Sequence, residues 1–180
     1  MQILEMGVRY KRTGAVISPR PVNSAARIVE YTRDAFEERP LQEAMWIVLL
    51  NRKNMPLGRH LISLGSSSST VVEPCCMLRA VILSGATAFV AAHNHPSGNP
   101  APSLSDCTLT RAVQTLARLI NVSFLDHVIV GRPEDDPLGL GYFSFRAADS
   151  MSGGLQPSRL MLSRILRRRW KESPAARNVA

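Results

Sequence analysis

Three stretches of the chain repeat apolar residues every three or four positions, which is the spacing of one face of an α-helix. Ser24 and Ser103 each stand directly before such a stretch, where a serine side chain can cap the helix N-terminus. Pro74 suits the first turn of the remaining helix, and Gly85 suits its end. We therefore expect helices at residues 24–38, 74–85 and 103–120.

Short apolar runs separate these helices, and their length and patterning are typical of β-strands. Residues 44–50, Ala-Met-Trp-Ile-Val-Leu-Leu, are wholly apolar, which favours a strand buried on both faces. We expect strands at residues 44–50, 57–64, 87–92, 124–131 and 142–146, with a short one around residues 8–12. Helices that alternate with such strands predict an α/β sandwich around a mixed sheet.

The chain of 180 residues is long enough for one domain with a hydrophobic core and short extensions. Pro19 and Pro21 argue against a continuous element near the start, so residues 1–22 are interpreted as a leader. Residues 23–147 hold the remaining predicted elements and are interpreted as the domain. Residues 148–180 are interpreted as a linker followed by a basic C-terminal tail.

Most of the excess positive charge lies in that tail. The net charge is +8, and seven basic residues but only one acidic residue follow Ser150. A basic segment favours phosphate-rich or otherwise acidic partners. Two interpretations of residues 159–171 stay open, namely a solvated basic helix without a partner and a contact with nucleic acid.

The sequence disfavours several classes of protein. No apolar run approaches the length of a membrane span, so no membrane contact is expected. The first residues lack the basic-then-apolar pattern of a signal peptide, and we expect a cytoplasmic protein. Cys75, Cys76 and Cys107 are an odd number without Cys-x-x-Cys spacing, so neither a disulfide framework nor a cysteine zinc site is predicted.

The sequence Ala-His-Asn-His-Pro-Ser-Gly at residues 92–98 carries the strongest chemical signal. His93 and His95 follow a predicted buried strand, and Asp106 lies in the first turn of the helix that Ser103 can cap. Two imidazoles and a carboxylate supply three ligands for a divalent metal ion. Three protein ligands with an open fourth position are typical of catalytic zinc, so the pattern predicts a metal-activated water in a hydrolase.

Such a site also needs a general base. Glu43 directly precedes the first buried strand and is the carboxylate best placed for this, provided that its strand neighbours the one ending at His93. Structural interpretations stay open beside the functional ones. They are a charge at the strand start for Glu43, a helix cap for Ser103 and a dipole-compensating carboxylate for Asp106. The Asp-His pair at residues 126–127 is interpreted as structural or as support for the ligands, with hydrogen bonds to the loop that carries them.

The order Glu…His-x-His-Pro-(x6)-Ser-x-x-Asp resembles the motif of the JAMM metalloproteases, also called JAB1/MPN proteins. The surrounding sequence resembles the bacterial branch of that superfamily, the RadC-type (UPF0758) proteins. The resemblance covers roughly residues 23–147. It depends on five blocks that recur in order, at residues 46–54, 91–98, 102–106, 125–131 and 142–145.

The resemblance implies a cytidine-deaminase-like α–β sandwich of the JAMM/MPN type. It implies a zinc ion (Zn²⁺) on His93, His95 and Asp106, with Glu43 as the base that takes the water proton and returns it to the leaving amine. Ser103 would hydrogen-bond the oxyanion or the metal-bound water. The implied activity is hydrolysis of peptide or isopeptide bonds in an unidentified protein or peptide substrate.

Two other functions stay open at the level of the sequence. The chain could be a DNA-associated accessory protein of the DNA-repair type, with a structural or vestigial metal site. It could also be a partner-binding module that uses the same scaffold without catalysis. The intact set of ligands with Glu43 argues against the module, because a scaffold has no need of a base.

Overall fold

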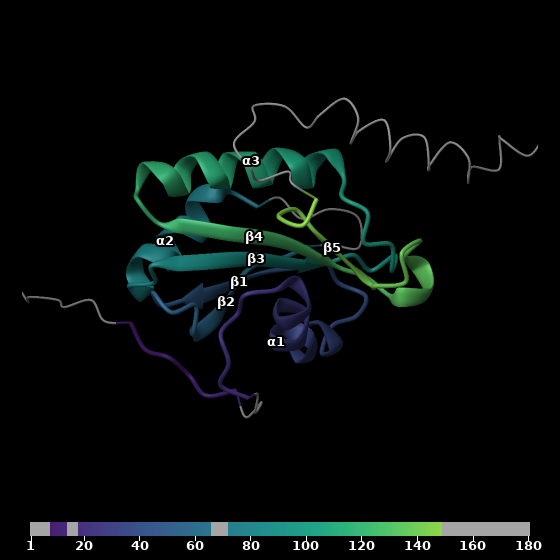
Figure 1. The fold of residues 1–180 in the computed structure, drawn as a ribbon, viewed down its shortest axis with the longest axis horizontal. Helices are drawn as coiled ribbons and strands as arrows, with labels where there is room; N and C mark the ends of the chain where they lie inside the picture. The colour runs from purple at the N-terminus through teal and green to yellow at the C-terminus, as the bar shows by residue number, and fades with distance from the viewer. Residues whose placement is uncertain (1–7, 14–17, 66–71, 149–180) are drawn as a thin grey trace, which may run out of the picture.

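The computed structural model describes residues 8–13, 18–65 and 72–148, which contain an α/β sandwich around a five-stranded mixed sheet (Figure 1). In the order β2-β1-β3-β4-β5, the strands are β2 (Pro56–Leu64), β1 (Ala44–Leu50), β3 (Ala88–Asn94), β4 (Ser123–Val130) and β5 (Tyr142–Ser144). The helices are α1 (Ala25–Glu37), α2 (Pro74–Ser84), α3 (Leu104–Leu119) and the short 3₁₀ helix η1 (Pro133–Asp135). The predicted fold class is confirmed.

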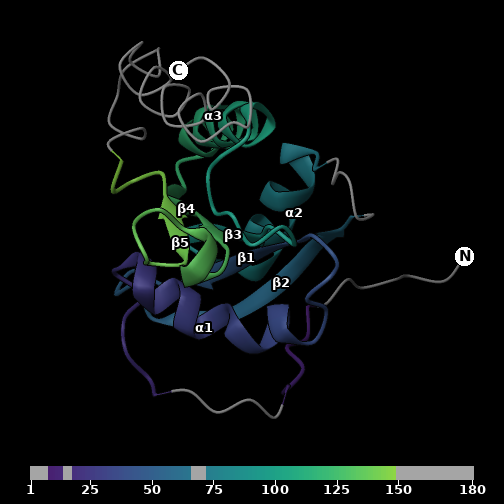
Figure 2. The same ribbon diagram turned by 90° about the vertical axis from the view of Figure 1, so that its right-hand side faces the viewer.

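The sheet separates two layers of helices, and each layer has its own hydrophobic core (Figure 2). On one face α2 and α3 cover the sheet, and Met77, Phe89 and Val113 are buried between them and the strands. On the other face α1 packs Ile28 against the sheet. Successive side chains of a strand point to opposite faces, so the apolar strands β1 and β3 contribute to both cores.

The ends of the helices follow the capping signals in the sequence. The Ser24 side chain accepts a hydrogen bond from the Arg27 backbone N–H at 3.3 Å and caps α1. Gly85 ends α2 with φ of 67°, a left-handed conformation that glycine adopts without a steric penalty from a Cβ atom. Ser103 and Asp106 form a reciprocal capping box at the start of α3.

The sheet register makes the end of β3 a meeting point of several elements. β1 runs antiparallel to β3, with Met45 opposite His93. β4 runs parallel to β3, with Ile129 opposite His93. A parallel pair needs a crossover connection, and α3 supplies it. The first turn of α3 contacts the end of β3 through Asp106, so side chains from distant parts of the sequence meet there.

The strand predicted around residues 8–12 is wrong. Residues 8–13 form no strand. The Tyr10 ring lies against Gly58 of β2, and its hydroxyl donates to the Ser84 carbonyl oxygen at 3.3 Å. The segment is therefore held by a side chain and not by backbone pairing with the sheet.

The other predicted strands agree with β1 to β4 within two residues at each end. The last predicted strand is too long, since β5 ends at Ser144 and not at residue 146. The chain turns there, and the Ala148 backbone N–H donates to the Ser144 carbonyl oxygen at 3.1 Å. A turn of this kind ends strand pairing.

Several predictions fall on residues that the structure does not describe. The linker after residue 148, the basic tail and its contact with nucleic acid through residues 159–171 all lie outside the described residues. The division into leader, domain and tail likewise stays a prediction. Within residues 8–13, 18–65 and 72–148, no helix is long and apolar enough to cross a membrane.

Candidate metal centre

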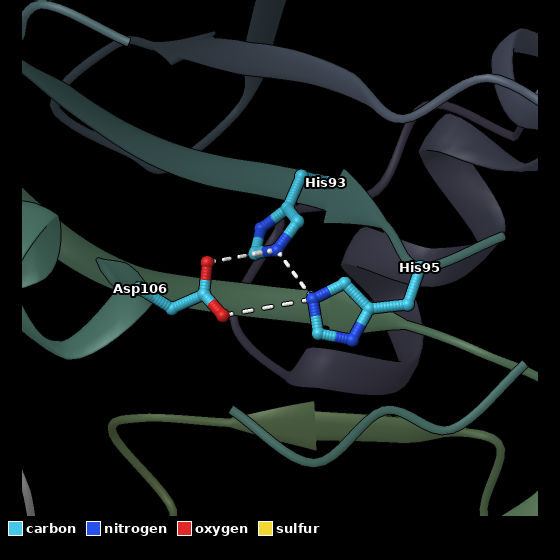
Figure 3. Close-up of side chains that lie close together, drawn as sticks. All are labelled: His93, His95 and Asp106. Atoms are coloured by element: carbon cyan, nitrogen blue, oxygen red, sulfur yellow. Dashed lines mark hydrogen bonds and ion pairs between the residues drawn. The ribbon is translucent and has the colours of Figure 1, made fainter. Parts of the chain in front are cut away.

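Three side chains converge where β3 ends (Figure 3). His93 belongs to β3, His95 to the following loop, and Asp106 to the first turn of α3. The Nε2 atoms of His93 and His95 lie 3.0 Å apart. Asp106 Oδ1 lies 3.1 Å from His93 Nε2, and Asp106 Oδ2 lies 3.6 Å from His95 Nε2. The structure therefore brings together the three residues that the sequence predicted as metal ligands.

His93 is completely buried, and its ring has a contact at each nitrogen. His93 Nδ1 lies 2.8 Å from His127 Nε2, and His127 Nδ1 lies 2.6 Å from Thr110 Oγ1. Burial and the neighbouring His93 lower the pKa of His127 well below its ordinary value. His93 Nδ1 is therefore engaged behind the site, and Nε2 is the nitrogen that faces the other two ligands.

A tight turn directs His95 back toward the cluster. The His95 backbone N–H donates to the Val130 carbonyl oxygen at 2.9 Å, and the Gly98 N–H donates to the His95 carbonyl oxygen at 2.9 Å. His95 Nδ1 lies 2.8 Å from the Asn99 carbonyl oxygen. Because a carbonyl only accepts, Nδ1 must carry the proton, and Nε2 holds the lone pair of the neutral ring. Burial lowers the pKa of His95, but Asp106 and the Asn99 carbonyl outweigh it and raise that pKa.

Asp106 is held by the capping box of α3. The Ser103 backbone N–H and hydroxyl both donate to Asp106 Oδ2, at 2.7 Å and 2.5 Å. Burial would raise the pKa of Asp106, but the imidazoles of His93 and His95 and the Ser103 hydroxyl hold it well below its usual range. Asp106 is therefore a carboxylate at neutral pH, and Ser103 orients it. The predicted contact of Ser103 with an oxyanion or a bound water stays a prediction.

The donors and their spacing fit a small divalent cation. In a tetrahedral zinc site with bonds of about 2.0–2.1 Å, neighbouring ligand atoms lie about 3.4 Å apart. Here the two histidine Nε2 atoms lie 3.0 Å apart, and one ligand atom from each of the three residues lies within 4.8 Å of the others. Two imidazole nitrogens and a carboxylate that face one position can each donate a lone pair to a cation between them. The residues therefore fit a metal ion, and three ligands leave a coordination position open.

Glu43, the predicted base, lies directly before β1 at the edge of this cluster. Continuing the β1–β3 register past the pair of Met45 and His93 brings Glu43 opposite His95. The Glu43 carboxylate also contributes to the raised pKa of His95, after the larger effects of burial, Asp106 and Asn99. The condition on which the prediction depended is therefore met, since β1 neighbours β3. The role of Glu43 as a base stays a prediction.

Asn94 is a functional candidate that the sequence interpretation missed. Its side chain is buried, with 6% of the residue exposed. Asn94 Oδ1 accepts from the Ala44 backbone N–H at 2.8 Å, and its Nδ2 donates to the Gln42 carbonyl oxygen at 2.9 Å. These two bonds bracket Glu43 and fix its segment beside the cluster. The available signal was a polar residue between two ligands, which strand geometry directs to the opposite face of the sheet.

The Asp-His pair at the middle of β4 has two separate roles. Asp126 accepts from the Ser144 hydroxyl at 2.7 Å and from the Arg146 backbone N–H at 3.0 Å, so it holds the chain after β5. The structural interpretation agrees with these contacts. His127 lies behind a ligand, which agrees with the interpretation as support, but it contacts His93 itself and not the loop that follows β3.

A cavity of about 1310 Å³ lies away from the cluster. It runs along β2 between α1 and α2, where Tyr10, Trp46 and Arg59 help to line it, and no member of the cluster lines it. The cluster instead reaches solvent at the end of the sheet through His95, whose side chain is 17% exposed. The cluster is therefore accessible from that end.

The fold and the His-x-His…Asp cluster at the end of a buried strand define a domain of the JAB type. The chain belongs to the RadC-like JAB domain family, whose family model matches residues 22–150. The resemblance to RadC-type proteins is confirmed.

Three curated relatives are UPF0758 proteins. The chain is 37% identical to one from Coprothermobacter proteolyticus over 132 residues, which are 72% of this chain and 56% of that protein. It is 36% identical to one from Gloeothece citriformis over 138 residues, which are 64% of this chain and 57% of that protein. It is 32% identical to one from Thermotoga maritima over 144 residues, which are 79% of this chain and 60% of that protein. The chain thus spans little more than half the length of these relatives.

Proposed function

We propose that this chain is a zinc-dependent hydrolase that cleaves peptide or isopeptide bonds. The observation that carries the proposal is that three ligand atoms, one each from His93, His95 and Asp106, lie within 4.8 Å of one another. A structural zinc site is closed by four protein ligands, whereas a catalytic site keeps a position open. Glu43 beside the ligands supports hydrolysis, and so does membership of a family in the JAB/MPN superfamily, whose members are often hydrolytic.

The donor set favours zinc over harder cations. Imidazole nitrogen suits zinc and other first-row transition metals, whereas magnesium and calcium prefer oxygen ligands. Two of the three ligands here are imidazoles. Bound zinc would supply a water of lowered pKa and a Lewis acid for the scissile carbonyl.

The residues of the chain would divide the remaining work. Glu43 takes a proton from the attacking water and delivers it to the leaving amine. Asn94 holds the Glu43 segment through its bonds to Gln42 and Ala44. Ser103 keeps the Asp106 carboxylate turned toward the histidines. Proton transfer and ligand orientation therefore depend on different residues and can be tested separately.

Metal content and hydrolysis form the two halves of the test. Wild-type chain loaded with Zn²⁺ and desalted should hold about one zinc per chain, and His95→Ala should lose it. The zinc-loaded protein should cleave members of an internally quenched peptide library. If it is an isopeptidase, it should instead cleave a second library, in which the same sequences are joined by an isopeptide bond through a lysine ε-amine. Glu43→Gln should keep its zinc and cleave about 10²- to 10⁴-fold more slowly, because an amide cannot accept the proton.

Glu134→Gln is a matched control, because Glu134 is an exposed glutamate on η1. It should keep both zinc and cleavage. Zinc retained by His95→Ala at wild-type affinity would contradict the metal site. Full cleavage by Glu43→Gln would contradict the proposed base, and a zinc-loaded wild type that cleaves nothing in either library would contradict the hydrolase.

A further inference from the structure

A buried chain of hydrogen bonds joins two of the candidate ligands behind the site. It runs from His93 through His127 and Thr110 to the backbone carbonyl of Asp106, with distances of 2.8, 2.6 and 2.6 Å. His93 and His127 are 0% exposed, and Thr110 is 4% exposed. Donors and acceptors buried to this extent must find their partners within the protein. The positions of the protons along these hydrogen bonds can therefore be assigned, starting from the Thr110 end.

The assignment begins at Thr110, which has a single hydroxyl proton. That proton is donated to the Asp106 backbone carbonyl oxygen, which can only accept. Thr110 Oγ1 is then an acceptor toward His127, so His127 Nδ1 must carry a proton. Full burial disfavours the charged imidazolium, so His127 Nε2 holds a lone pair. His127 Nε2 consequently accepts from His93, and His93 Nδ1 is the donor.

We propose that Thr110 and His127 are positioning residues that fix the tautomer of His93, so that its Nε2 lone pair faces the metal site before any metal binds. Without these hydrogen bonds the neutral His93 ring could carry its proton on Nε2 instead, and that N–H would point into the site and exclude a cation. The inference rests on the proposed function, since it takes His93 as a ligand. It assigns to Thr110 and His127 a role that is neither metal binding nor catalysis.

The tautomers can be measured directly in the metal-free protein. The chain has four histidines, so a long-range ¹H–¹⁵N correlation spectrum of the labelled, chelator-treated protein at neutral pH contains few ring signals. We expect both His93 and His127 to carry their proton on Nδ1. A proton on His93 Nε2 in the wild type would overturn the proposal. The measurement uses no substrate, so it decides the inference even if the chain proves not to be a hydrolase.

Three substitutions on α3 test whether the Thr110 hydroxyl fixes the tautomer of His93. Thr110→Val removes the hydroxyl with little change of shape and should weaken the binding of Zn²⁺ about 10- to 100-fold, measured by competition with a chromophoric chelator. Its spectrum should lose the uniform Nδ1–H pattern. Thr110→Ser keeps the hydroxyl and should restore both. Thr115→Val is the matched control, because Thr115 makes the same bond to the carbonyl four residues earlier, at 2.9 Å, but is exposed.

The results separate positioning from mere packing. Thermal melts establish that each variant is folded, and Thr110→Ala replaces Thr110→Val if the valine variant does not fold. Wild-type zinc affinity and an unchanged tautomer pattern in the hydroxyl-free variant would overturn the proposal. So would equal losses in Thr110→Ser and Thr110→Val, because the serine hydroxyl should rescue a tautomer effect but not a defect of packing.

Discussion

Replacing Asn94 by alanine removes the bracket around Glu43 and leaves all three candidate ligands in place. The Asn94 amide bonds to Ala44 and Gln42, on either side of Glu43. His93 and His95 keep their own partners, His127 and Asn99, which the substitution does not touch. Asn94→Ala should therefore keep zinc and lose cleavage, because the proposed base is no longer held beside the cluster.

The loss of stability can be worked from burial. Ala44 is 2% exposed, so its N–H is left without an acceptor and without access to water, which costs about 1–3 kcal/mol. Gln42 is exposed, so water replaces its lost donor at little cost. In a domain of this size about 1 kcal/mol shifts the melting temperature by about 2–4 °C. A loss of about 2 kcal/mol thus predicts a melting temperature about 4–8 °C below that of the wild type.

Thermal unfolding, zinc content and peptide cleavage should be measured on the same preparations. Asn51→Ala is the comparison, since the Asn51 side chain also makes two bonds to the backbone, but in the turn between β1 and β2. Its Oδ1 accepts from Lys53 at 2.9 Å and from Met55 at 3.1 Å. That variant should lose stability and keep cleavage. An Asn94→Ala protein with wild-type melting temperature and cleavage would refute the reasoning. Loss of zinc in Asn94→Ala would also refute it, because Asn94 would then support the ligands and not Glu43.

Two further predictions concern the scaffold. Gly131→Ala should lower the melting temperature much more than Gly139→Ala. A Cβ at residue 131 would lie 2.1 Å from the Gly98 carbonyl oxygen, whereas a Cβ at residue 139 would meet no atom within 4 Å and would be strained only by its φ of +68°. Equal losses would contradict this close approach. The hydrogen bond from Arg59 lowers the pKa of Asp34 more than burial raises it. The ion pair therefore stabilises the folded protein above the unfolded pKa of Asp34, about 4. This stabilisation is lost as the pH falls through the lower pKa of the folded state. Between about pH 5 and pH 2, the melting temperature of Asp34→Asn should therefore fall less than that of the wild type. Parallel pH profiles of the two melting temperatures would contradict a stabilising ion pair.

Local signals account for much of the fold. Ser24 and Ser103 cap their helices and Gly85 ends the second, because each acts on backbone groups within three or four residues of itself. The wholly apolar run at residues 44–50 is another local signal. A strand without polar residues can be buried on both faces, and β1 is almost entirely buried. Residues 8–13 show the limit of such signals. Whether such a short segment pairs with a sheet depends on its tertiary contacts and not on its own sequence.

The candidate site divides in the same way. His93, His95, Ser103 and Asp106 lie within fourteen consecutive residues, and the end of a strand followed by a helix start is enough to bring three of them together as ligands. Their spacing therefore carried the prediction of a metal site. Glu43 was predicted from its place directly before the first buried strand, on the condition that this strand neighbours the one ending at His93, and the JAMM-type motif implied the same residue.

By itself the sequence determined the helices, the strands and the cluster of ligands, because each depends on contacts between near neighbours along the chain. Only the tertiary structure decided which strand lies beside β3 and what stands behind each ligand. Asn94 reaches Ala44 across 50 residues of sequence, and His93 reaches His127 across 34. Such partners are chosen by the order and register of the strands in the sheet. That order follows from packing two cores at once, which no local pattern encodes.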